Sequence, residues 1–278
     1  MVNILTDSCS DLSPELIKKF NLHVIPLSVV VKDRLFHDGI DITPADLFQS
    51  VQDTGELPKT SAPSLAEFTA FYQSIPGDLV YIGIGSKLSA TVQNAAVAAR
   101  NLPDRKIFVV DSNNLSTGIG LLALKAAELR DEGLRAEEIA KEITQAAEKI
   151  HTSFVVETLD YLYLGGRCSA LQNIAGSLLK IRPIIETKPN GTLGVKEKIR
   201  GTRKRALDSM LEDFKKNSAL IDLKRVFITH TGCDDDATYL KSHLYQSAPI
   251  QEIWTTLAGA TISSHCGPNT IGVIYVLR

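Results

Sequence analysis

The sequence has few of the features that mark a special class of protein. Its four cysteines stand singly among 278 residues, with no C-x-x-C pair: Cys9, Cys168, Cys233 and Cys266. This spacing argues against a zinc ribbon or a redox pair and fits reduced thiols in a cytosol. No apolar run is long enough to span a bilayer. The first residues lack the basic region and apolar core of a secretory signal, so we expect a cytoplasmic protein.

Charge of one sign is also lacking, because the formal net charge is only −2. Nothing therefore points to broad electrostatic binding of nucleic acid or of an anionic membrane. With 44% hydrophobic and 22% charged residues, the chain has the composition of a globular protein with a substantial core. Its length fits one large domain or two domains of ordinary size.

The usual enzyme motifs are missing as well. A nucleophile elbow, G-x-S-x-G, fails because Leu88 follows Ser86 where the last glycine belongs. No segment matches a P-loop, and no His, Cys, Asp or Glu spacing is typical of a metal site. Asp7 follows a strand as in aspartyl phosphatases, but Cys9 replaces the second Asp of such a pair. The sequence therefore favours a binding role without a cofactor or metal.

The most informative stretch is 80–94, VYIGIGSKLSATVQN, in which a short apolar strand turns into a helix. Ser86, Ser89 and Thr91 place hydroxyls at or near the start of the helix predicted over 89–100. Unpaired N–H groups and the positive end of the helix dipole favour an anion at that point. This predicts a site for a carboxylate or phosphate. The competing interpretation is that Ser86 or Ser89 only caps the helix.

The first half of the chain alternates strands with helices, which predicts a parallel sheet. Strands are expected at 2–5, 23–31, 78–83 and 106–110, and the proline-bracketed segment 57–64 is expected to be irregular. Ligands bind at the carboxyl ends of such strands. Polar residues that follow three strands would meet in one crevice there: Thr6, Asp7, Ser8, Ser86, Asp111 and Ser112. Alternatively, Asp7 and Asp111 only cap the turns that follow them.

The pattern changes after about residue 151 to shorter strands and a hairpin signal at 188–191. We expect a loop at 161–169, a short apolar helix at 170–179 and a strand at 261–264 that ends before His265. A largely antiparallel sheet with helices on one side fits this half. The sequence thus predicts an α/β protein of two domains, 1–150 and 151–278, with a ligand cleft between them.

Two single residues are candidates for that cleft. His265 stands in SSHCGP, where a lone histidine is more often a structural residue than a ligand-binding one. Arg167 in the GGRC segment is either an ordinary surface charge or a group that holds a carboxylate or phosphate with two hydrogen bonds.

Eight stretches of the chain resemble the DegV family of bacterial fatty-acid-binding proteins. They are ILTDSCSDL (4–12), PKTSAPS (58–64), IGSKLSATVQNA (84–95), VVDSNNLSTGIGLLAL (109–124), TLDYLYLGGRCS (158–169), GSLLKIRPII (176–185), KEKIRGTRKRAL (196–207) and SSHCGPNTIGV (263–273). They follow one another over nearly the full chain. The resemblance implies two α/β domains that enclose one long-chain fatty acid, with its tail in an apolar tunnel.

The resemblance also implies which residues bind the carboxylate of the fatty acid. The matching positions are Thr60, Ser61, Ser89 and His265. Some members of the family present the lipid to a separate ATP-binding fatty acid kinase. The kinase phosphorylates the bound carboxylate to acyl phosphate, which feeds phospholipid synthesis. Such a role makes the kinase a partner and allows transient contact with a membrane.

Three other interpretations of these residues stay open at this stage. A serine hydrolase or acyltransferase would use Ser89 or Ser86 with His265 as base. The sequence shows no clear acid to orient the histidine, although Asp7 could serve in principle. A plain nucleotide or sugar-phosphate binder is suggested less. The basic run 196–205 is usually a solvated face. As a hypothesis, Arg200 or Arg203 within it docks the kinase.

Overall fold

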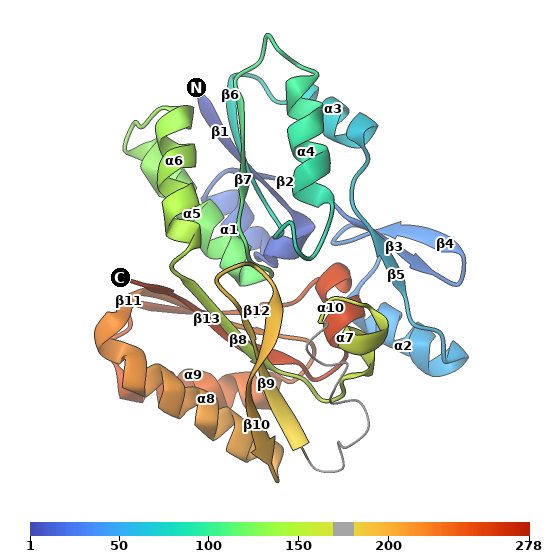
Figure 1. Ribbon diagram of the computed structural model, residues 1–278, viewed down its shortest axis with the longest axis vertical. Coiled ribbons are helices and arrows are strands. Elements are labelled where there is room, and N and C mark those ends of the chain that lie inside the picture. The colour runs from blue at the N-terminus through green and yellow to red at the C-terminus, as the bar shows by residue number, and fades with distance from the viewer. Residues whose placement is uncertain (169–180) are drawn as a thin grey trace.

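The computed structural model describes residues 1–168 and 181–278. Its first sheet is built from four parallel strands near the N-terminus (Figure 1). Their order across the sheet is β2 (Leu22–Ile25), β1 (Val2–Asp7), β6 (Asp78–Gly83) and β7 (Ile107–Asp111). Because all four strands run the same way, their carboxyl ends lie at one edge, next to the second half of the molecule.

Helices cover both faces of this sheet, as expected for parallel strands. Helices α3 (Leu65–Ser74) and α4 (Thr91–Arg100) pack together on one face, while α5 (Thr117–Asp131) and α6 (Ala136–Ala147) cover the other. The short helices α1 (Pro14–Lys19) and η1 (Ser8–Ser10) follow β1. Helix α3 begins at a capping box in which Ser64 and Glu67 exchange hydrogen bonds, as its sequence indicates.

The second sheet has six strands and is mixed but mostly antiparallel. Its order is β10 (Leu193–Arg200), β9 (Ile181–Thr187), β8 (Ile150–Val155), β13 (Ile271–Leu277), β11 (Ile221–His230) and β12 (Glu252–Leu257). Among these described strands, β11 and β12 pair in parallel and the other neighbours pair antiparallel. Helices α8 (Arg203–Asn217) and α9 (Asp234–Ser247) pack side by side on one face (Figure 1), and η3 (Ser218–Leu220) follows α8. The predicted fold class is confirmed.

A third, small antiparallel sheet extends from the first half of the chain. Its order is β4 (Arg34–His37), β3 (Ser28–Val31) and β5 (Lys59–Ser61), and α2 (Pro44–Thr54) lies between β4 and β5 in the sequence. Two short helices of the second half lie beside it: α7 (Asp160–Leu164) and α10 (Ala260–Cys266). This corner, where both halves of the chain meet, contains the candidate site.

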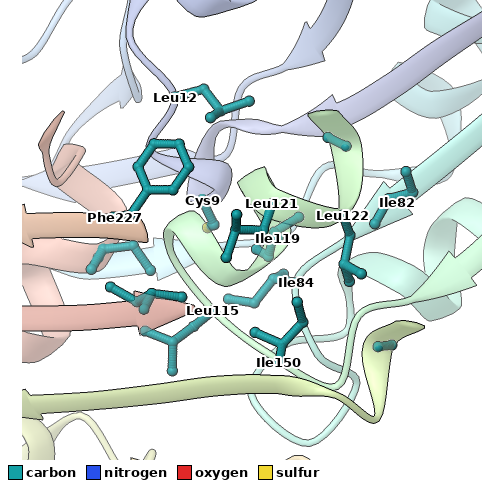
Figure 2. Close-up of a cluster of buried hydrophobic side chains, with 14 of the residues drawn as sticks. Cys9, Leu12, Ile82, Ile84, Leu115, Ile119, Leu121, Leu122, Ile150 and Phe227 are labelled. Atoms are coloured by element: carbon teal, nitrogen blue, oxygen red, sulfur yellow. The ribbon is translucent and has the colours of Figure 1, made fainter. Parts of the chain in front are cut away.

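Helix α5 lies between the two large sheets and is the centre of the core. It packs against β1 and β6 on one side and against β8, β11 and β13 on the other. Ten of its fifteen residues are buried, which is typical of a helix with apolar neighbours all round. Glycine permits this close packing, because a Cβ on Gly120 would lie 2.8 Å from Cδ2 of Leu12. The resulting cluster joins Leu12 to Ile119 and to Phe227 of β11 (Figure 2).

Several sequence predictions of local structure were wrong. The segment 261–264 is part of helix α10 rather than a strand, and 160–164 forms helix α7 within the predicted loop. Residues 59–61 form strand β5, although two prolines flank them. The predicted strand 23–31 is two strands in different sheets, separated at Pro26. The helix predicted at 170–179 lies outside the described residues.

In the part of the chain that the structure describes, no helix combines the length and apolar character needed to cross a membrane.

Candidate functional site

A cavity lies where the small sheet meets helices α7 and α10, and it spans about 530 Å³ when the open solvent at its mouth is included. Its wall combines residues from before and after position 150. The apolar part of the wall consists of Leu27, Ala62, Ile84, Leu88, Leu115, Leu162, Leu193, Ile262 and Cys266. The polar part consists of Thr60, Ser61, Ser89, Arg167, Thr261 and His265. A mostly apolar pocket with a few polar groups is the usual form of a small-molecule site.

Thr60 and His265 form the central polar pair of this wall. Thr60 is on β5 and His265 is on α10, and Oγ1 of Thr60 lies 2.8 Å from Nε2 of His265. Burial, followed by the nearby charge of Arg167, lowers the pKa of His265 from 6.5 to about 4. The imidazole is therefore neutral at pH 7, and the pair can offer hydrogen bonds without a buried positive charge.

Helix α10 is fixed at its start by two buried carboxylates from the first half of the chain. Oδ1 of Asp11 accepts the N–H of Gly259 at 2.8 Å, and Oδ1 of Asp38 accepts the N–H of Ala260 at 2.6 Å. These bonds satisfy donors that have no partner within a helix. Burial raises the pKa of Asp11 well above its usual value. The anchors place Thr261, Ile262 and His265 at the cavity.

Ser89 lies in the turn between β6 and α4 and reaches the cavity from the opposite side. Its Oγ is 2.7 Å from Oγ1 of Thr91 and accepts the N–H of Thr91 at 3.3 Å. Ala90, which cannot cap with its side chain, occupies the formal cap position of α4. The hydroxyls of Ser89 and Thr91 therefore lie together at the start of this helix, as the sequence predicts.

Arg167 lines the cavity and links its two sides. Its Nη1 donates to the carbonyl oxygen of Gly165 at 2.6 Å, and its Nε donates to that of Leu88 at 3.4 Å. Ser61 lies on exposed strand β5 at the same cavity. The structure thus brings five of the six predicted ligand-binding residues together: Thr60, Ser61, Ser89, Arg167 and His265.

Ser86, the sixth, is not among the residues that line the cavity. Its backbone N–H donates to both carboxylate oxygens of Asp111, at 3.2 and 3.3 Å. Asp7 is used in the same way: its Oδ2 accepts from the hydroxyl of Tyr81 and the N–H of Ile84. Burial raises the pKa of Asp7 to about 6. These two acids end strands on either side of β6, at the same edge of the sheet, but they hold turns together rather than line the cavity.

The sequence did not single out Thr261, whose buried Oγ1 has no hydrogen-bond partner among the described residues. The apolar residues Leu115, Ile262 and Cys266 were also missed. These three line a second chamber as well, with an empty volume of about 320 Å³, which reaches Phe154 and Ile274. Helical spacing could have identified those on α10, since His265 follows Thr261 by four residues and Cys266 follows Ile262 by four, which places each pair on one face of a helix. The prediction of a strand at 261–264 prevented this interpretation.

The two predicted docking arginines differ in their surroundings. Arg203 forms ion pairs with Glu157 and Asp236, and its side chain is only 18% exposed. Arg200 is exposed at an open groove between β10 and α8, which Arg205 also lines. Within residues 1–168 and 181–278, no three His, Cys, Asp or Glu side chains are grouped so that they could hold a metal ion.

Comparison with known proteins gives one consistent family. A profile described as an uncharacterised protein of the DegV family matches residues 1–278. A DegV domain-containing protein of Caldanaerobacter subterraneus subsp. tengcongensis is 32% identical over 278 residues, which cover 99% of this chain and 98% of that protein.

Solved structures agree in fold over the full length. A fatty-acid-binding DegV family protein from Thermus thermophilus superposes with a TM-score of 0.93 at 31% identity, covering 100% of this chain and 99% of that one. A stearic-acid-binding protein from Eubacterium ventriosum gives a TM-score of 0.87 at 25% identity, covering 100% and 98%.

Proposed function

The chain belongs to the DegV family, and on that premise we propose that it binds one long-chain fatty acid in the cavity described above. The hydroxyls of Thr60 and Ser89 and the imidazole of His265 bind the carboxylate, with Ser61 at the rim. The tail lies against the apolar wall. The observation that carries this proposal is the combination, in one cavity, of a neutral hydrogen-bonding cluster with a mostly apolar lining.

The energetics of such a ligand fit the wall. Burying about fourteen methylenes at about 0.8 kcal/mol each gives a gross gain on the order of 11 kcal/mol, before ordering costs. A buried carboxylate opposes binding by several kcal/mol unless it is hydrogen-bonded. Hydroxyls and a neutral imidazole provide those bonds, and the Arg167 guanidinium adds a favourable potential nearby.

The second chamber supplies a path for the tail. It shares Leu115, Ile262 and Cys266 with the main cavity and extends to Phe154 and Ile274 of the second sheet, beside hydroxyls such as that of Thr229. We propose that the tail passes these three shared residues and ends in the second chamber. A ligand held in this way has its head group near Thr60 and its methyl end near the second sheet.

Extraction of the purified protein with organic solvent, followed by mass spectrometry, tests this function. The proposal predicts about one long-chain fatty acid per chain, or saturable uptake of added palmitic acid by lipid-free protein. Repeated absence of fatty acid together with no uptake of palmitic acid would contradict it.

The hydrolase alternative requires a chain of hydrogen bonds that runs from a serine to a histidine and from the histidine to an acid. The described part of the chain has a different set of hydrogen bonds. Ser89 pairs with Thr91 and His265 pairs with Thr60, while Nδ1 of His265 has no acid or other hydrogen-bond partner there. This arrangement favours binding over nucleophilic catalysis.

Ser89→Ala separates the two hypotheses. We expect about a tenfold loss of palmitic acid affinity, since a hydrogen bond to a charged group contributes about 1.5 kcal/mol or more. Titration calorimetry measures the affinity, and Ser242→Ala on the surface of α9 is the matched control. Ester hydrolysis by the wild-type protein that disappears in Ser89→Ala would instead support the hydrolase.

We further propose that the protein presents the bound lipid to a separate ATP-dependent fatty acid kinase and has no catalytic activity of its own. The exposed Arg200 and Arg205 offer guanidinium groups to such a partner at a groove whose wall also carries Lys198 and the acids Glu197, Asp208 and Glu212. Arg203 is held by its ion pairs within the chain and is less suited to this role.

Arg200→Ala is expected to lower the rate of acyl phosphate formation with the kinase about tenfold, because one interface cation is lost. Palmitic acid affinity should change less than twofold. Arg100→Ala, an exposed arginine at the end of α4, is the control and should leave both values unchanged. Equal rates for Arg200→Ala and wild type would exclude Arg200 from docking.

A further inference from the structure

Helices α7 and α10 pack against each other (Figure 1). A glycine follows the last residue of each helix, and each glycine faces a ring on the other segment. A Cβ on Gly165, after α7, would lie 2.6 Å from Nδ1 of His265. A Cβ on Gly267, after α10, would lie 2.7 Å from Cδ2 of Tyr161. Real Cβ atoms do not approach other atoms so closely, so a side chain at either position would move a neighbour.

The backbone at Gly165 does not itself require glycine. Its φ of −68° and ψ of −15° lie in the right-handed helical region that every residue adopts. Gly166 is the opposite case, because its φ is +69° and open space surrounds its Cβ position. The missing side chain at 165 therefore matters for its neighbours, which are the His265 ring and the carbonyl oxygen of Tyr161, both 2.6 Å from the Cβ position.

The orientation of the His265 ring depends on this packing, because only one of its two nitrogens has a hydrogen-bond partner among the described residues. Nε2 is 2.8 Å from Oγ1 of Thr60, whereas buried Nδ1 has no hydrogen-bond partner within the described ranges. A functional histidine is usually oriented by a hydrogen bond at its second nitrogen. Here Gly165 occupies that side of the ring. Its own carbonyl is held by Arg167 at 2.6 Å, which fixes the turn.

We infer that Gly165 is a positioning residue of the fatty-acid site: by leaving room beside Nδ1, it lets the His265 imidazole point Nε2 at Thr60 and the cavity. The inference rests on the proposed function, since it assigns Gly165 to the head-group end of that same site. A methyl group at 165 would push the ring away from Thr60. Gly165→Ala would then lower the affinity only by displacing the His265 ring, so the loss could not exceed the loss caused by removing the imidazole.

Gly165→Ala tests this in a double-mutant cycle with His265→Ala. We expect Gly165→Ala to weaken palmitic acid binding about tenfold in the wild-type background and less than twofold in the His265→Ala background. In lipid-free protein, the ¹⁵N signals of the His265 ring should shift in Gly165→Ala. Gly166→Ala is the control: it strains the same turn without adding an atom near the ring, so its effect should add to that of His265→Ala.

Other outcomes overturn the inference. Affinity unchanged in Gly165→Ala, or the same loss in both backgrounds, would show that the position acts elsewhere, for example through the Tyr161 carbonyl. If Gly165→Ala alone does not fold, the Gly165→Ala/His265→Ala protein should recover folding in part, because the clash with the ring is removed while the contact with the Tyr161 carbonyl stays. A double variant no more folded than Gly165→Ala would refute the role. Failure of wild-type protein to bind palmitic acid would reject the proposed function instead.

Discussion

Replacing His265 with alanine is expected to weaken palmitic acid binding by about 10- to 100-fold. The variant removes the imidazole that lies 2.8 Å from Thr60 and leaves the hydroxyl of Thr60 without this partner. A hydrogen bond to a charged group contributes about 1.5–3 kcal/mol. The carboxylate would lose this bond, and the Thr60 hydroxyl that also binds it would no longer be held in place by the imidazole. Titration calorimetry measures the affinity, and circular dichroism checks that the protein folds.

Two variants control this experiment. His265→Gln keeps an N–H donor of similar reach and should recover part of the affinity. His243→Ala removes a histidine on α9, whose Nδ1 is 2.8 Å from the carbonyl oxygen of Tyr239, and should bind palmitic acid normally. Equal affinities for His265→Ala and wild type would remove His265 from the site.

The same experiment has a pH arm. Because burial lowers the pKa of His265 to about 4, the imidazole of the lipid-free protein is neutral when the carboxylate reaches it. Affinity should therefore stay level between about pH 8 and pH 5.5 instead of following an ordinary imidazole near 6.5. A tenfold rise in affinity on acidification through pH 6.5 would show that an imidazolium ion binds the ligand, contrary to this account.

Acid should destabilise the fold through a second histidine of low pKa, the half-buried His151, and His151→Gln should remove that effect. His151 stacks on Tyr275 with ring centroids 4.6 Å apart, and its Nε2 lies 3.1 Å from Nζ of Lys196. Burial, followed by the Lys196 charge, lowers the pKa of His151 to about 4; Asp213 and Glu186 oppose this only partly. The folded state therefore resists the proton that the unfolded state accepts near pH 6.5.

The sign of this linkage is a loss of stability on acidification. The unfolded chain binds the proton first, so the free energy of unfolding falls between about pH 6.5 and pH 4, by about 3 kcal/mol in total for this group. Urea denaturation at pH 7, 5.5 and 4.5 should show a shallower fall in His151→Gln than in wild type.

A control and an opposing group complete the design. His37→Gln, whose side chain is 38% exposed, controls for loss of a histidine in general. Asp7 acts in the opposite direction: its pKa is raised to about 6, so its contribution to stability falls as the pH rises from about 3.8 to 6. Comparing each variant with wild type at each pH cancels the Asp7 contribution. Parallel pH curves for His151→Gln and wild type would contradict the prediction.

The fold was largely predictable because the two halves of the sequence have different periodicities. Strands such as 78–83 and 107–111 alternate with helices, which leaves a parallel sheet as the simple arrangement. The errors lie where tertiary contacts override local preference. Thr261 and Ile262 are β-branched and favour a strand, yet Asp11 and Asp38 accept the N–H groups that begin helix α10.

The site was predictable in its polar residues and not in its geometry. Thr60, Ser89 and His265 were carried over from the family resemblance, and all three line one cavity. Which hydroxyls reach it depends on the direction of each turn, and the sequence does not specify that direction. Ser86 differs from Ser89 by only three positions, but Asp111 holds its turn away from the cavity.

The central claim is that the carboxylate of a fatty acid binds among Thr60, Ser89 and His265, with the tail buried in the cavity and in the second chamber beside it. A crystal structure of the protein with palmitic acid tests this most directly. The account predicts carboxylate oxygens about 3 Å from the hydroxyls of Thr60 and Ser89, with the tail running past Leu115 and Ile262. A carboxylate bound elsewhere, or a tail lying on the outer surface, would contradict it.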